Sequence, residues 1–106
     1  MVNEYTRYRI PDDMCLAFLS DYRMAGEYLR ASSACLGYEL GRCEEEQACF
    51  ILRITWQSTA AHLEGFRASE EFRRFLPLIK PYISFIEEMR HYVATDICWN
   101  RIEAQR

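Results

Sequence analysis

The amino-acid sequence predicts an α+β fold of the ferredoxin-like type, a βαββαβ antiparallel sheet with its helices on one face. Three observations predict it. Several short segments alternate between apolar and polar residues with the period of a strand. Other segments carry apolar residues at helical spacing, and the two kinds follow one another in the order βαββαβ. The length of 106 residues suits one domain.

The first strand and helix are predicted near the N-terminus. Residues 3–10 are rich in Tyr and Thr and alternate, which is typical of a strand. Pro11 follows with two acidic neighbours, and this combination is a signal for the start of a helix. Apolar side chains then recur at helical spacing from Cys15 to Leu29, so we expect a helix over about 12–30.

Residues 35–43 and 49–56 are predicted to form two strands, joined by the acidic turn EEEQA. In the first of them, Leu36, Tyr38 and Leu40 share one face. One face of the second is wholly apolar and should be buried: Phe50, Leu52, Ile54 and Trp56.

The second helical region is expected to divide in two. Ser58 and Ser69 are each suited to cap the N-terminus of a helix. Pro77 is expected to kink or restart the second of these helices, and Pro81 to end it.

The last strand is expected within 85–95, so that residues 1–95 form the domain and 96–106 a C-terminal tail or arm. Helices cover only one face of such a sheet. The other face, which carries Ile51, Arg53 and Thr55, is only partly polar. We therefore expect a second copy of the chain to cover it in a homodimer.

The charge pattern argues against several partners. The chain has 13 basic and 16 acidic residues, with no basic block for a nucleic acid. No apolar run approaches the ~20 residues that span a membrane. The charged N-terminus does not resemble a signal peptide, so we expect a cytoplasmic protein whose five cysteines are reduced.

The stretches GYELGR, FILRITWQSTAAHLEGFRASEEFRRF and IEEMRHY resemble the antibiotic biosynthesis monooxygenase (ABM) domain. That family has a strand ending in Trp-Glu/Gln-Ser, a helix with a His/Phe-Leu pattern and a Ser-x-x-Phe helix. The resemblance spans roughly residues 5–95. It implies a dimeric α+β barrel with a pocket between each sheet and its helices. Some members oxidise hydroquinone-like or polycyclic phenols with O₂ and no cofactor, others degrade haem, and others have no assigned substrate.

At two positions this chain departs from the enzymatic branches of that family. Quinol-oxidising members have Asn where this chain has Leu52, and haem-degrading members have a His ligand where it has Leu76. Haem degradation is therefore disfavoured. We expect a cofactor-independent monooxygenase acting on a quinol or related aromatic molecule, with no haem, flavin or metal. The alternative is a non-catalytic dimeric module that binds a ligand or a partner, for example beside a haem protein.

The candidate site residues are aromatic or carry an imidazole. His62 or His91 could remove a phenol proton, because imidazole has a pKa of ~6.5, while core or interface positions suit both as well. Trp56 is either pocket wall or core where the strand ends. The remaining expected substrate-binding residues are Tyr38, Tyr92, Phe66, Phe72 and Phe75. No His or Cys spacing indicates a metal site.

Overall fold

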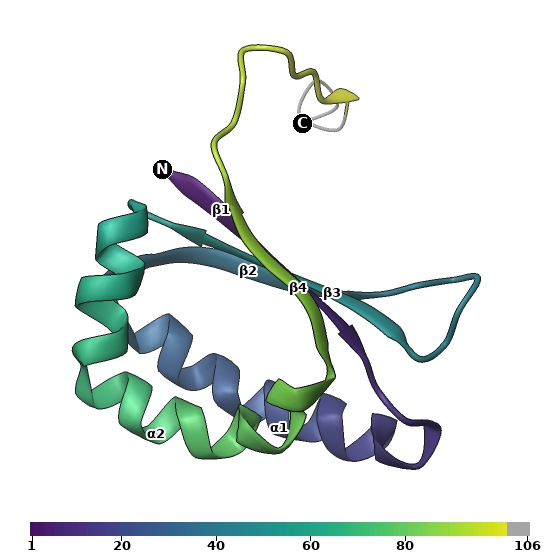
Figure 1. Cartoon of the computed structure of the whole chain (residues 1–106). Coiled ribbons are helices and arrows are strands. Elements are labelled where there is room, and N and C mark those ends of the chain that lie inside the picture. Colours follow the sequence, from purple (N-terminus) through teal and green to yellow (C-terminus); the bar gives the residue numbers. More distant parts are fainter. Residues whose placement is uncertain (102–106) are drawn as a thin grey trace.

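A computed structural model of the chain describes residues 1–101. Its strands are β1 (Val2–Arg9), β2 (Cys35–Arg42), β3 (Cys49–Trp56) and β4 (Ile86–Tyr92), paired antiparallel in the order β2-β3-β1-β4. Helices α1 (Cys15–Ala31) and α2 (Glu70–Ile79) lie on the same side of this sheet (Figure 1). The predicted ferredoxin-like α+β arrangement is confirmed.

Short helical segments complete the chain between these elements. A 3-10 turn, η1 (Asp12–Met14), leads into α1. Between β3 and α2 the chain forms a π-helical turn, η2 (Ala61–Gly65), and a 3-10 turn, η3 (Phe66–Ala68). A further 3-10 segment, η4 (Lys80–Phe85), connects α2 to β4.

Both predicted serine caps are present. The Ser69 hydroxyl accepts a hydrogen bond from the Phe72 N–H at 3.2 Å, and the Ser58 hydroxyl accepts one from the Ala61 N–H at 2.9 Å. The helix does not restart at Pro77, because α2 continues through it to Ile79. Pro77 lies on the exposed side of the helix, where water can bond the carbonyl that its missing N–H leaves free.

The two faces of the sheet differ sharply in burial. In β1 the residues facing the helices are buried, whereas the intervening ones are half-buried or exposed. The helix-facing row of β3 is buried throughout, as predicted. In β2 the predicted row is broken, because the register against β3 shifts between Cys35 and Gly37. Leu36 therefore points away from the core and is 52% exposed, while Tyr38 and Leu40 remain on the helix side.

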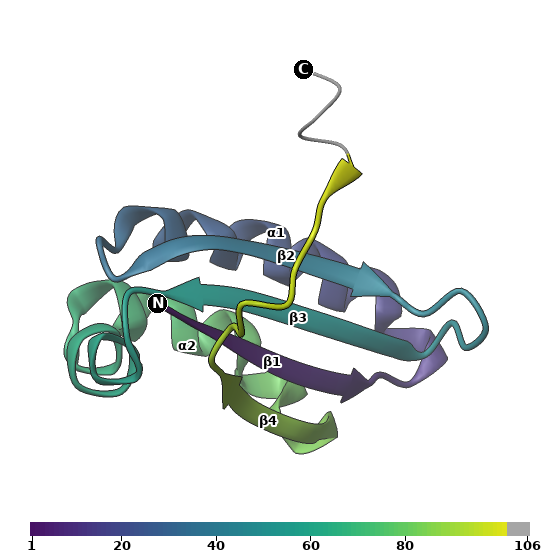
Figure 2. The ribbon, with the colours of Figure 1, turned by 90° about the horizontal axis from the view of Figure 1, so that it is seen from above.

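The chain leaves β4 on the uncovered side of the sheet (Figures 1 and 2). Three apolar side chains in this segment are exposed, namely Val93, Ile97 and Trp99. The rest of the expected C-terminal arm, from 102 onward, lies outside the described residues. Within residues 1–101 no helix combines the length and apolar character needed to cross a membrane.

Candidate functional site

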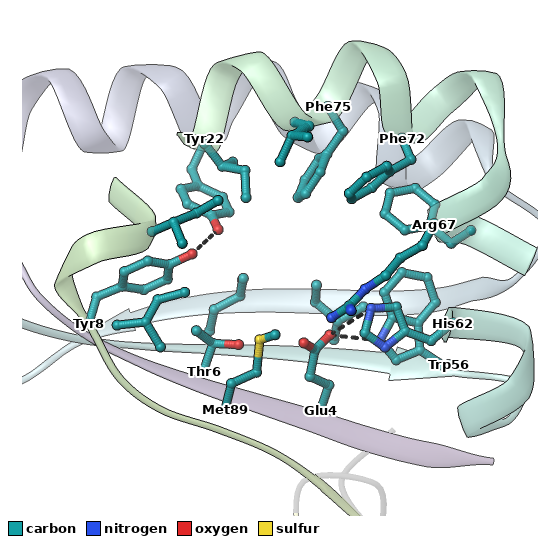
Figure 3. Close-up of a pocket in the computed structure, with 17 residues that line it drawn as sticks. Glu4, Thr6, Tyr8, Tyr22, Trp56, His62, Arg67, Phe72, Phe75 and Met89 are labelled. Atoms are coloured by element: carbon teal, nitrogen blue, oxygen red, sulfur yellow. Dashed lines mark hydrogen bonds and ion pairs between the residues drawn. The ribbon is translucent and has the colours of Figure 1, made fainter. Parts of the chain in front are cut away.

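A cavity of about 300 Å³ lies between the helix-facing side of the sheet and the helical layer (Figure 3). Its walls are largely apolar. Phe66, Phe72 and Phe75 line it, and Phe66 contacts the other two edge to face with ring centroids 5.5 and 5.4 Å away. Small-molecule sites typically measure ~300–1,000 Å³, so this cavity suits a ligand of one or two fused rings.

One end of the cavity is polar because β1 places an acidic residue among the inward-facing side chains. Glu4 is only 4% exposed. Its Oε1 accepts a hydrogen bond of 2.9 Å from the indole Nε1 of Trp56, which is itself fully buried. Burial raises the pKa of Glu4, since an apolar site disfavours the charged form, while the Trp56 hydrogen bond acts in the opposite direction.

The structure brings the two histidines together beside Glu4. His62 comes from η2, and His91 lies directly opposite Glu4 in the pairing of β1 with β4. The Nδ1 of His62 and the Nε2 of His91 are 2.8 Å apart, a hydrogen bond. On its other side, His62 Nε2 is 3.7 Å from Glu4 Oε1, too far for a hydrogen bond. The three side chains form a row, Glu4–His62–His91, in which Glu4 and His62 are buried and His91 is partly buried.

The ring of His62 is held in a fixed orientation. It stacks on Trp56 with ring centroids 4.3 Å apart and an angle of 6° between the planes. Burial, together with the smaller effect of the nearby positive charge of Arg67, lowers the pKa of His62 to about 4. His62 is therefore neutral near pH 7 and able to accept a proton.

Arg67 supplies the positive charge of this end. It follows η2 in the chain, and its guanidinium reaches into the cavity toward Glu4 and His62 (Figure 3). Arg67 opposes the effect of burial on Glu4. The site thus combines a hydrogen-bonded carboxyl group, a neutral imidazole and a cation at the end of an apolar cavity.

The family model of antibiotic biosynthesis monooxygenases matches residues 1–78. The chain belongs to the antibiotic biosynthesis monooxygenase family. It is 24% identical over 92 residues to the uncharacterized protein YczJ of Bacillus subtilis, covering 87% of this chain and 97% of the relative. The resemblance seen in the sequence is confirmed.

Solved structures share the fold of this ABM protein. Rv0793 from Mycobacterium tuberculosis superimposes with a TM-score of 0.72 and 17% identity, over 92% of this chain and 98% of that one. The crystal structure of an antibiotic biosynthesis monooxygenase gives a TM-score of 0.67 and 23% identity, over 92% and 100%. At these identities the likeness establishes the architecture alone.

Two tyrosines expected to bind substrate in this ABM protein lie away from the cavity. Tyr92 is the neighbour of His91 in β4, so it points to the uncovered face, where it meets Tyr5 edge to face at 5.5 Å. The hydroxyl of Tyr38 accepts a hydrogen bond from the guanidinium of Arg30 in a separate hollow between α1 and β2. Neither tyrosine lines the cavity, so neither is positioned to orient a ligand there.

Two residues of the polar end were missed in the sequence. Glu4 carried a readable signal, because it occupies the inward phase of a strand whose other inward residues are Val2, Thr6 and Tyr8. The sequence around Arg67 contains no such signal, because arginine is common in short exposed turns. That its side chain reaches the cavity depends on the tertiary fold.

The row Glu4–His62–His91 also has the side chains that could hold a metal ion. Glu4, His62 and His91 each offer a ligand atom, and these atoms lie within 4.8 Å of one another. Two imidazoles and a carboxylate suit a divalent transition metal. However, a metal would have to replace the hydrogen bond between the two histidines.

We expect freshly purified protein to contain no metal, haem or flavin. Elemental analysis and the visible absorbance spectrum check this, and stoichiometric metal or a chromophore would contradict it.

Lowering the pH from about 6.5 toward 4 is expected to reduce stability through His62. Its pKa is lower in the folded than in the unfolded chain, so the unfolded chain takes up the proton first. This contribution is fully present above the unfolded pKa and is lost as the pH falls through the folded value. Glu4, whose pKa is raised, opposes the trend.

Denaturant unfolding between pH 4 and 7 checks this expectation. The free energy of unfolding should decline more steeply toward low pH in the wild type than in His62→Gln, because glutamine does not titrate. If the free energy of unfolding falls equally with pH in both proteins, titratable groups other than His62 cause the decline.

Proposed function

We propose that this protein is a cofactor-independent monooxygenase that oxidises a quinol or related small phenol with O₂. The observation that carries the proposal is the row Glu4–His62–His91 at one end of an apolar, aromatic-lined cavity. Membership of a monooxygenase family supports the reaction class. The size of the cavity favours a substrate with one or two rings.

The first step is removal of a phenol proton. His62 Nε2 faces Glu4 and the cavity and is unprotonated near pH 7, so it can accept the phenol proton; because its lowered pKa makes it a weak base, the transfer depends on passing a proton on to His91. Nδ1 then passes a proton across the 2.8 Å hydrogen bond to His91, which is only partly buried and so leads toward solvent. Arg67 stabilises the phenolate that remains.

The second step is oxidation of the phenolate by O₂. One electron passes from the electron-rich ring to O₂, and the resulting radical pair joins to form a carbon–oxygen bond. Cleavage of the O–O bond leaves one oxygen atom on the ring and releases the other as water. A hydroquinone and O₂ thus give a hydroxyquinone and water, with both electron pairs that O₂ requires supplied by the substrate. The apolar walls exclude water from this step.

Oxygen uptake across a panel of one- and two-ring hydroquinones tests the function. We expect uptake above the uncatalysed rate for at least one member, and one atom of label in the product from ¹⁸O₂. The variant Tyr92→Phe, altered on the uncovered face, should behave as wild type. Uptake at the uncatalysed rate for every member would refute the proposal, as would unlabelled quinone with hydrogen peroxide.

The alternative function is a ligand-binding module without catalysis. Leu52 favours it, because this buried residue lines the cavity where quinol-oxidising members of the family have a polar side chain. A quinone that binds in the cavity while the matching hydroquinone is not consumed would establish this alternative.

We expect the protein to act as a cytoplasmic homodimer joined through the uncovered face of its sheet. On that face Ile51 is 40% exposed and Tyr92 is 45% exposed. Ile51→Lys should therefore weaken the dimer. Leu63→Lys is the matched control, since Leu63 is equally exposed but lies on η2. Sedimentation at micromolar concentration measures both, and a wild-type monomer near 12.6 kDa would contradict the expectation.

A further inference from the structure

The cavity has a second polar group at the end away from Glu4 (Figure 3). It consists of Tyr8 of β1 and Tyr22 of α1, whose hydroxyl groups hydrogen-bond to each other. The two side chains are only 1% and 6% exposed. Both rings pack edge to face on Phe18, at 5.0 and 5.1 Å, so the hydroxyl groups are held in place from behind.

This pair has a hydrogen-bond donor to spare. Two hydroxyl groups carry two O–H donors, and the bond between them uses only one. Within residues 1–101 neither hydroxyl has another hydrogen-bond partner. Burial raises the pKa of Tyr8 to about 12 and that of Tyr22 well above its ordinary value, so both remain neutral donors. A buried donor without an acceptor is costly, and both residues line the cavity.

The two polar ends are suitably spaced for one flat ligand. Glu4 and Tyr8 lie four residues apart in β1 and face the same side, which places their backbones ~13 Å from each other. The walls between them are mainly apolar, with Leu52 and Ile54 of β3 on the side of the sheet and the side chains of α2 on the side of the helices.

We propose that Tyr8 and Tyr22 form a second anchor, which donates a hydrogen bond to an oxygen at the far end of the ligand. The site would then select aromatic molecules that carry oxygens at both ends over those with one. Tyr8 and Tyr22 are positioning residues here and take no part in proton or electron transfer. The inference shares with the proposed function only the premise that the cavity binds an aromatic molecule.

Calorimetric titration with 2,3-dimethyl-1,4-naphthoquinone tests the anchor without turnover. The methyl groups block addition of the free cysteines to the quinone. Tyr8→Phe and Tyr22→Phe each keep the ring but leave one O–H donor free for the ligand, so the decisive protein is the double variant Tyr8→Phe/Tyr22→Phe, whose fold thermal unfolding checks. We expect the double variant to weaken quinone binding about tenfold, the value of one buried hydrogen bond. Binding of the oxygen-free 2,3-dimethylnaphthalene should not weaken.

Tyr5→Phe is the matched control, because Tyr5 lies in the same strand but faces the uncovered side. It should leave both affinities unchanged. Wild-type quinone affinity in the double variant Tyr8→Phe/Tyr22→Phe would overturn the anchor, as would a wild-type protein that binds the quinone no better than the hydrocarbon. Tyrosine-dependent binding without oxygen uptake would instead support the anchor and refute only the monooxygenase function.

Discussion

Replacing His62 with glutamine is expected to lower kcat for quinol oxidation by about 10²–10⁴-fold, the usual contribution of a general base. Glutamine keeps a polar side chain beside Trp56 but cannot take up the phenol proton. His62 is the imidazole that lines the cavity, whereas His91 lies behind it at 2.8 Å. The loss should therefore appear in kcat, with KM little changed.

His91→Gln provides the comparison within the same hydrogen-bonded row. It should cost less than His62→Gln, since the first proton acceptor remains and only the exit toward solvent is impaired. Thermal unfolding of both variants verifies that the fold is retained. If His62→Gln turns over quinol at the wild-type rate, another group is the base and the proton route through His62 is wrong.

Replacing Trp56 with phenylalanine is expected to lower the free energy of unfolding by about 2–5 kcal/mol, from imperfect filling of a core site and loss of a buried hydrogen bond. That is a large part of the ~5–15 kcal/mol that typically stabilises a domain. Trp56 is fully buried, donates its N–H to Glu4 and stacks on His62. Turnover should fall as well, because the same ring orients two site residues.

A double-mutant cycle separates the hydrogen bond from simple packing. In a Glu4→Leu background no side-chain acceptor is left for the Trp56 N–H, so Trp56→Phe should cost less than it does in the wild type. Denaturant unfolding of the four proteins measures the difference. Equal costs in both backgrounds would mean that Trp56 acts through packing alone. Quinone affinity measured on the same four proteins shows whether Trp56 also contributes to ligand binding.

The order and type of the main elements could be predicted because each has a local signal. The alternation in 49–56 gives β3 its bounds, and Ser69 caps α2 as expected. The register shift near Leu36 and the π-helical turn at 61–65 were not predicted, because both depend on how strands and helices meet in space. Periodicity within one segment does not report such contacts.

The site was predictable only in part, for the same reason. His62 and His91 were recognised by their chemistry, but their contact required β4 to pair with β1 and η2 to fold over that edge. Tyr92 was placed in the site although it alternates with His91 in one strand. Applying the two-residue period of β4 to the functional residues would have separated them.

The position of β4 affects when the site can form during synthesis. The other elements that line the cavity all precede β4 in the chain, and β4 is the last strand within residues 1–101 to leave the ribosome. Until it arrives, one edge of β1 has unpaired backbone groups and His62 lacks its histidine partner. A nascent chain can therefore assemble the aromatic walls before the hydrogen-bonded pair of histidines is complete. Premature termination within 79–91 would yield a product that exposes the unpaired edge of β1, with which other chains can pair, and that lacks the complete histidine pair.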